Sequence, residues 1–214
     1  MNAIKTVSVF GASGRVGKEV VKLSLLQGFK VKAHCRLNSK CEIKHENLSI
    51  FKGEISDYNL IRDVIEGSDC VIITLGQRAP YKDIFCGKST GMIVKAMEET
   101  GVKRLVCLTG AMIGESEKNL TFPFKMMKKM MTRKRPEVFD DRAGQEVAVI
   151  QSPLDWTLVK PPRLIENGER KIFIYSETLK MGLSSSIGFD DLAEFLVEQI
   201  TSKDYLQKAV YVKY

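Results

Sequence analysis

Three glycines at three-residue spacing form the segment of this sequence with the clearest chemical meaning. The segment 11–17 (GASGRVG) lies between a short β-branched run and an apolar helical pattern. Gly11 permits a sharp turn, Gly14 lets the backbone approach a ligand, and Gly17 lets the helix lie close to the strand. Amides at a helix N-terminus attract an anion. A strand, a glycine turn and a helix in this order predict a dinucleotide site in which the loop binds the diphosphate. The alternative is a tight turn without a ligand.

The residue expected beside the adenosine ribose is a cation. Sites that prefer NAD place an Asp or Glu about 20 residues after the loop, at the end of the second strand. Arg36 occupies that place, and Lys40 follows it. A guanidinium matches a 2′-phosphate and gains little from a 2′-hydroxyl. Arg36 and Lys40 therefore predict NADP(H) in preference to NAD(H), unless Arg36 is only a solvated cation at the end of a strand.

Hydrophobic runs predict the elements that hold these residues. In the first half, strands are expected at 5–10, 29–35, 48–52, 70–75 and 104–109, and helices at 15–27, 57–65 and 89–100. The helix between the second and third strands is expected to be missing or very short. In the second half, helices are expected at 140–151 and 190–200, and strands at 156–159, 172–175 and 209–212. This alternation predicts an α/β, Rossmann-type doubly wound fold, with a mostly parallel sheet and helices on both faces.

Domain organisation follows from length and from the absence of a linker. The chain has 214 residues and shows neither a repeat nor a break in composition. We expect one NAD(P)-binding domain over 1–214. Residues 1–110 would form the dinucleotide-binding core, and residues 111–214 would form a smaller, irregular part that completes the sheet and faces the acceptor.

Composition excludes several classes of protein. The chain is 44% hydrophobic and 28% charged, and it has no run approaching the roughly 18 apolar residues that a membrane span needs. No secretory signal is expected, since the N-terminus leads directly into a strand pattern. Five cysteines lack a Cys-x-x-Cys spacing, and Cys70 and Cys107 lie in apolar runs, so we expect reduced thiols in a cytoplasmic protein. Two histidines without paired spacing predict no metal site.

The excess positive charge is confined to one segment. Residues 118–135 (KNLTFPFKMMKKMMTRKR) hold seven basic residues and no acidic one, and outside them 26 basic residues face 26 acidic ones. A nucleic-acid-binding protein usually carries a broad basic face, whereas the charge here is confined to one segment, so no nucleic-acid partner is expected. Met126, Met127, Met130 and Met131 share one face of a predicted helix. That face either packs on the core or forms a contact surface for a membrane, an anionic ligand or a protein partner.

Several motifs together resemble a known family. They are GASGRVG at 11–17, Arg36, KGEISD at 52–57, LGQR at 75–78, VKRLVCLTGA at 102–111 and DWTLVKPPRL at 155–164. In these the chain resembles the atypical short-chain dehydrogenases/reductases, specifically the NAD(P)H-binding, NmrA-like proteins and the biliverdin reductase B (flavin reductase) group. The likeness runs from about residue 4 to the C-terminus and is weakest at 115–138.

The resemblance implies a set of cofactor contacts. It places the diphosphate on the glycine loop and the 2′-phosphate near Arg36 and Lys40. It places adenine at Glu54 and Ile55, where Glu replaces the family's Asp, and the ribose and diphosphate beside the exit of the fourth strand. The nicotinamide would lie at the exit of the fifth strand, backed by a Lys-Pro-Pro segment. The residues implied are Gly11, Ser13, Gly14, Arg15, Val16, Gly17, Arg36, Lys40, Glu54, Ile55, Leu75, Gly76, Arg78, Thr109, Gly110, Lys160, Pro161 and Pro162.

Departures from the family bear on catalysis. No tyrosine has a lysine four residues later, so the Tyr-x-x-x-Lys pair of the usual short-chain dehydrogenases is missing. Gly110 stands where flavin-reductase-like members have Ser, and Arg163 stands where biliverdin reductase B has His. Arg163 is the candidate catalytic residue, able to hold an anionic substrate or to stabilise developing negative charge. The alternative is a surface salt-bridge partner.

Two functions compete on these grounds. The first is an NADPH-dependent oxidoreductase that transfers hydride to a small-molecule acceptor such as a flavin, a quinone or a similar planar compound. Such a reaction needs orientation of the hydride more than a strong protein acid. The second is a non-catalytic NADP(H)-binding redox sensor or assembly protein, whose partner would contact the basic segment 118–135. Nucleotide-sugar epimerase or dehydratase activity is disfavoured, because the chain lacks Tyr-x-x-x-Lys and is short for a sugar-binding domain.

Overall fold

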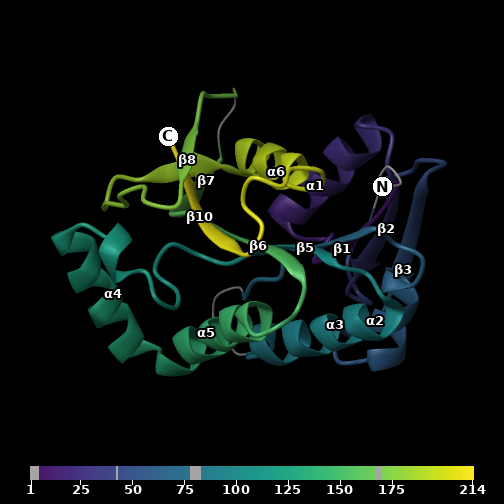
Figure 1. Cartoon of the computed structure of the whole chain (residues 1–214), viewed down its shortest axis with the longest axis horizontal. Helices are drawn as coiled ribbons and strands as arrows, with labels where there is room; N and C mark the ends of the chain where they lie inside the picture. The colour runs from purple at the N-terminus through teal and green to yellow at the C-terminus, as the bar shows by residue number, and fades with distance from the viewer. Residues whose placement is uncertain (1–4, 42, 78–82, 167–169) are drawn as a thin grey trace.

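A central sheet of eight strands organises the molecule (Figure 1). The computed structural model describes residues 5–41, 43–77, 83–166 and 170–214. The strand order is β3-β2-β1-β4-β5-β6-β10-β8, and every pairing is parallel except that of β8 with β10. The strands are β1 (Thr6–Phe10), β2 (Lys30–Cys35), β3 (Leu48–Lys52), β4 (Cys70–Ile73), β5 (Arg104–Leu108), β6 (Asp155–Lys160), β8 (Ile174–Ser176) and β10 (Lys208–Lys213).

Helices cover both faces of the sheet (Figure 1). On one face lie α1 (Arg15–Leu26) and α6 (Phe189–Glu198), and on the other lie α2 (Tyr58–Ile65), α3 (Cys86–Thr100) and α5 (Pro136–Ile150). Val71, Ile72 and Ile73 of β4 are all fully buried, because both faces of that strand are covered. The predicted Rossmann-type architecture is confirmed.

Local signals mark several of the helix ends. Asp57 caps α2 by accepting hydrogen bonds from the amides of Asn59 and Leu60. Gly28 and Gly101 follow α1 and α3 with φ of 84° and 75°, the left-handed conformation in which many helices end. Helix α3 begins three residues before its predicted start, because a side chain from α5 caps it. Residues 36–41 and 43–47, the described part of the connection between β2 and β3, contain no helix.

Two short strands were not predicted. β7 (Arg163–Ile165) and β9 (Ser186–Gly188) pair in parallel as a separate two-stranded sheet. Each has only three residues, and β7 follows directly on Pro161-Pro162. Neither is therefore long enough to show the alternation of apolar and polar residues that predicts a strand.

The expectation of reduced thiols throughout is wrong for one pair of cysteines. Cys35 and Cys41 form a disulfide, whereas Cys70, Cys86 and Cys107 are free and buried. Cys35 ends β2, and the chain then turns back, so that a spacing of six residues with no recognisable motif becomes a spatial contact. The disulfide closes the loop that carries Arg36 and Lys40.

The methionine face of the basic segment does not pack on the core as a whole. Residues Phe122–Lys134 form helix α4, preceded by a 3-10 turn at Glu117–Asn119. Met126 and Met130 are 53% and 62% exposed, and Phe124 is the buried residue of this helix. Phe124 and Met127 pack on a small cluster instead. In the described part of the chain, no helix is both long and apolar enough to cross a membrane.

Candidate functional site

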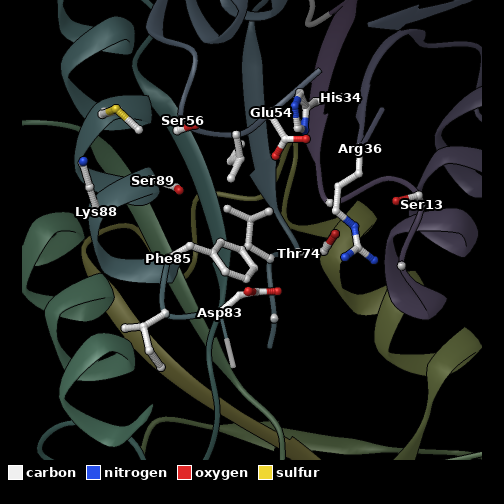
Figure 2. A pocket seen from close by; sticks show the side chains of 17 residues that line it. Ser13, His34, Arg36, Glu54, Ser56, Thr74, Asp83, Phe85, Lys88 and Ser89 are labelled. Carbon is white, nitrogen blue, oxygen red and sulfur yellow. The ribbon is translucent and has the colours of Figure 1, made fainter. Parts of the chain in front are cut away.

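A pocket of about 420 Å³ opens at the carboxyl ends of the parallel strands. It lies at β1, whose neighbours in the sheet are β2 on one side and β4 on the other. The strand order reverses at this point, and open α/β sheets bind ligands there. Figure 2 shows Arg36 and Ser13 on one side of the pocket and Phe85, Ser89 and Lys88 on the other. Its lining is Gly11, Ser13, Gly14, His34, Arg36, Glu54, Ile55, Ser56, Thr74, Leu75, Gly76, Asp83, Ile84, Phe85, Lys88, Ser89 and Met92.

The glycine loop is held tightly against the end of β4. Gly11 has φ of +85°, and a Cβ there would lie 2.9 Å from Thr74. A Cβ on Gly17 would lie 2.1 Å from the Gly11 carbonyl oxygen, so glycine is required for α1 to approach the loop. Thr74 supports this turn, since its hydroxyl donates to the Phe10 carbonyl at 3.0 Å. The N-cap of α1 is Gly14, which has no side chain to satisfy the first-turn amides, and these remain suited to an anion.

Arg36 stands at the wall of this pocket, as the sequence predicts for a 2′-phosphate ligand. It is exposed, and it follows β2 within the loop closed by the Cys35–Cys41 disulfide. Lys40 is exposed on the same loop but does not line the pocket. Of the two cations that the sequence assigns to a 2′-phosphate, Arg36 therefore lies at the pocket and Lys40 lies outside its lining.

His34 is a site residue that the sequence analysis missed. Its side chain is buried and lines the pocket, and Nε2 has no hydrogen-bond partner among the described residues. Burial lowers the pKa of His34, which keeps the imidazole neutral, and a hydrogen bond to the Gly53 backbone opposes that shift. The alternation along β2 could have indicated His34, since it precedes Arg36 by two residues and therefore faces the same side of the sheet.

The wall opposite the glycine loop comes from the start of α3. Ile84, Phe85, Ser89 and Met92 line the pocket there, and none was predicted. Asp141 of α5 positions this helix, because its carboxylate accepts from the amides of Cys86 and Gly87 at 2.9 and 2.8 Å. A side chain 55 residues away therefore caps α3, and no pattern within the α3 sequence could indicate it.

Helix α5 also ties together the exits of β4 and β5. The Arg142 guanidinium donates to the Leu75 carbonyl at 2.8 Å and to the Leu108 carbonyl at 3.5 Å. Leu75 and Gly76 both line the pocket, as predicted for residues beside the ribose and diphosphate. Arg142 is therefore a positioning residue for this edge of the sheet.

A buried polar cluster lies at the exits of β5 and β6. The Lys160 ammonium donates to both Glu146 carboxylate oxygens, at 2.7 and 2.8 Å, and to the Ile113 carbonyl at 2.6 Å. The Thr109 hydroxyl donates to the same carboxylate at 2.7 Å. Burial lowers the pKa of Lys160, and the Glu146 carboxylate opposes the shift. Gly114, with φ of +56°, makes room for this carboxylate, because a Cβ there would lie 2.2 Å from Oε2.

The structure places the predicted residues in several groups. Gly11, Ser13, Gly14, Arg36, Glu54, Ile55, Leu75 and Gly76 meet at the pocket. A second group lies at the same edge of the sheet but does not line the pocket: Thr109 and Gly110 after β5, Lys160 at the end of β6, and Pro161 and Pro162 after it. Val16 and Gly17 are buried behind the loop. Arg78 lies outside the described residues.

Two predicted arginines lie outside the pocket. Arg15 stacks over the Phe189 ring at 4.4 Å and lies 3.9 Å from Glu166, which joins the glycine loop to the chain that follows β7. Arg163, the candidate catalytic residue, is exposed at the start of β7 and pairs in register with Ser186 of β9. Neither arginine lines the pocket.

The residues present fit a phosphorylated dinucleotide. The loop leaves amides at the N-terminus of α1, Arg36 lies at the pocket wall, and the buried Nε2 of His34 has no partner in the part of the chain that the structure describes. A buried polar atom without a partner is costly, and a bound ligand is one way to satisfy it. The fold and this site define a Rossmann-type nucleotide-binding protein.

Comparison with known proteins assigns the family. The model of the NAD(P)H-binding family matches residues 11–203, and the chain belongs to that family. Oxidoreductase dmxR7 of Cryptosporiopsis sp. is 25% identical over 212 residues, which are 88% of this chain and 87% of that protein. Uncharacterized protein y4nG of Sinorhizobium fredii is 36% identical over 109 residues, and this match spans 48% of the chain but only 27% of y4nG.

Solved structures share the fold at low sequence identity. A short-chain dehydrogenase/reductase from Veillonella parvula in complex with NADP has a TM-score of 0.80 at 12% identity, covering 99% of this chain and 95% of the other. ChuY, described as an anaerobillin reductase from Escherichia coli O157:H7, has a TM-score of 0.75 at 16% identity, covering 97% and 96%. The predicted likeness to atypical short-chain dehydrogenases/reductases is confirmed.

Proposed function

We propose that this protein is an NADPH-dependent reductase that transfers hydride to a flavin, a quinone or a similar planar acceptor. The observation that carries the proposal is the position of Arg36, which lies at the wall of the same pocket as the glycine loop. Family membership supports dinucleotide binding, and relatives described as oxidoreductases support the reaction class. A neighbour of the same fold that is described as a reductase agrees with this direction of transfer.

The chain's own residues would bind and orient the reactants. The amides at the start of α1 would hold the diphosphate, and Arg36 with Lys40 would hold the 2′-phosphate. Glu54 and Ile55 would face the adenine, with His34 as a further partner on the same wall. NADPH supplies the hydride when bound, and the protein supplies orientation. Solvent can deliver the proton that a reduced flavin or quinone takes up.

The cluster around Lys160 would position the nicotinamide end. Thr109 and Lys160 converge on one carboxylate, that of Glu146, and this joins the exits of β5 and β6 to α5. With its ammonium inside a buried ion pair, Lys160 has no exposed proton to donate. Its role would be to keep Thr109, Gly110 and Pro161 in place around the ring.

The test is anaerobic oxidation of NADPH, followed by absorbance, against FMN, riboflavin and small quinones, with NADH as the specificity control. Saturable turnover that is faster with NADPH is the expected result. Gly110→Ser is a second variant to assay, since it introduces the serine that flavin-reductase-like members have at this position. The fold should tolerate it, because a Cβ on Gly110 would meet Ile113 at an ordinary 3.5 Å. Absence of turnover with every acceptor, together with tight NADPH binding by calorimetry, would contradict the reductase.

That negative result would favour the alternative, a non-catalytic NADP(H)-binding sensor or assembly protein. One observation favours it specifically. Glu146 and Lys160, the ionisable groups of the cluster at the exits of β5 and β6, form an ion pair with each other. Lys160 therefore has no exposed proton to donate to an acceptor. A sensor would bind NADPH and NADP⁺ with different affinities and would neither oxidise NADPH nor reduce an acceptor. Calorimetry with both forms distinguishes the two proposals.

A further inference from the structure

Helix α4 carries the charge excess of the chain, and it stands at one end of the molecule (Figure 1). It lies at the end opposite β3, beside the β10 side of the sheet. One face holds it to the body of the protein. Phe124 is buried in a cluster with Leu120, Met181 and Tyr211. The helix is therefore anchored along one side only.

One lysine of α4 belongs to this anchoring face. The Lys128 ammonium donates to the Gly114 carbonyl at 3.0 Å, to the Ser116 hydroxyl at 3.1 Å and to the Glu117 carboxylate at 2.6 Å. These contacts fix α4 to the turn before it. Lys128 thus serves the fold and is set apart from the other cations of the helix.

The opposite face presents three large apolar side chains to solvent. Phe122, Met126 and Met130 are 75%, 53% and 62% exposed. Their spacing of four residues places them in one row along the helix. A row of this kind has no stabilising role within the folded chain, since its side chains are left in water. Such exposed apolar rows mark contact surfaces.

Cations border this row. Lys125, Lys129 and Arg133 are exposed at positions adjacent to it on the helix surface, and Lys134 is exposed on its other side. Residues 118–135 hold seven basic residues and no acidic one, a charge equal to the net charge of the whole chain. The complementary partner is therefore anionic, and it must also accept apolar side chains.

We propose that the outer face of α4 docks on an anionic lipid surface. A bilayer interface offers both requirements together, since acidic headgroups meet the lysines and the acyl boundary takes up Phe122, Met126 and Met130. The helix has 13 residues, about 20 Å at 1.5 Å per residue, and would lie in the plane of the interface. The docking surface is independent of the proposed reductase activity.

The experiment is co-sedimentation of the intact protein with vesicles. Vesicles of phosphatidylcholine are compared with vesicles in which about 30% of the lipid is phosphatidylserine, the composition that supplies the surface potential. We expect binding to the acidic vesicles, weak binding to the neutral ones, and loss of binding as salt is raised. Circular dichroism of each variant verifies that the fold is retained.

Two sets of variants divide the surface into its parts. The set Lys125→Gln, Lys129→Gln and Arg133→Gln should lower the partition coefficient about 100-fold, from the contribution of each basic residue near an anionic membrane. The set Phe122→Ser, Met126→Gln and Met130→Gln should abolish co-sedimentation with the acidic vesicles, because it removes the side chains that enter the acyl boundary. Matched controls are Lys18→Gln with Lys30→Gln and Lys103→Gln, and Leu26→Gln with Ile172→Gln, which change exposed residues elsewhere.

Four outcomes of the binding experiments overturn the proposal, and a fifth comes from the oligomeric state. They are equal binding to neutral and acidic vesicles, no binding to either, binding that both α4 sets leave unchanged, and binding to a soluble polyglutamate as strong as that to acidic vesicles. The last would assign the face to an acidic protein. A dimer in light scattering that only the apolar set dissociates would assign it to a second copy, and would also overturn the lipid proposal.

Discussion

At the scale of single residues, Arg36 carries the cofactor preference. Its guanidinium lies at the wall of the pocket, where a 2′-phosphate would gain charge-assisted hydrogen bonds. Arg36→Asp should weaken NADPH binding by about 1–3 kcal/mol and leave NADH binding nearly unchanged. Calorimetry with both cofactors measures the difference, and Lys103→Asp, an exposed position far along the chain, is the control. Equal weakening for both cofactors would remove Arg36 as the selector.

His34 makes a separate prediction, on pH. Burial lowers its pKa below the ordinary value of 6.5, so the unfolded chain binds a proton more readily than the folded chain does. The free energy of unfolding should therefore fall as pH is lowered from about 7 through 6.5, and reach its full loss once pH is below the folded pKa. Urea unfolding between about pH 5 and pH 7.5 measures this.

The chain supplies its own control for that experiment, because it has only two histidines. His34→Gln should flatten the dependence on pH, whereas His45→Gln, at an exposed position, should leave it in place. If His34→Gln keeps the wild-type dependence of the unfolding free energy on pH, as His45→Gln should, then His34 does not titrate as its burial indicates.

At the scale of elements, the loop 35–41 joins the disulfide to the cofactor site. Closure by Cys35 and Cys41 restricts the backbone that carries Arg36 and Lys40, so less ordering is required when a phosphate binds. Cys41→Ser should raise the dissociation constant for NADPH, and reduction of the wild type by a dithiol should raise it equally. Calorimetry with and without reductant is the measurement. A Cys41→Ser variant that still responds to reductant would place the effect elsewhere.

The contact between α5 and β6 depends on a buried ion pair. Lys160→Met would leave the Glu146 carboxylate buried without its cation, at a cost of about 3–5 kcal/mol in the free energy of unfolding. The double variant Lys160→Met with Glu146→Leu should recover part of that loss, since no charge then remains buried. Lys22→Met, which breaks the exposed pair with Glu19, should cost less than about 1 kcal/mol in the same urea titration.

At the scale of the whole molecule, cofactor binding should stabilise the fold. The pocket is assembled from residues that follow β1, β2, β3 and β4 and from the start of α3, so unfolding destroys it. NADPH at 100 times its dissociation constant should add about 2.7 kcal/mol to the free energy of unfolding. Thermal melting with NADPH and with NADH at equal concentration should show a larger shift for NADPH. A shift of the same size in Arg36→Asp would contradict the assigned preference.

The sequence by itself determined the elements whose signals are local. The strand, glycine turn and helix at the start follow from chain geometry, because Gly17 must lack a Cβ for α1 to meet Gly11. Alternating strands and helices then require a parallel sheet, and a parallel sheet gathers its carboxyl ends at one edge. The glycine loop and Arg36 could be assigned to one site for that reason, whereas Glu54 and Leu75 were assigned from the resemblance to the family.

Only the tertiary structure decided the contacts between residues far apart in the chain. Asp141 caps α3 from α5, Glu146 joins Thr109 to Lys160, and Cys41 returns to Cys35. Each depends on where one segment docks on another, and no period or motif within a segment encodes that position. The same reason applies to α4. Its sequence indicates a helix with a methionine face, but the packing of Phe124 determines which side remains in solvent.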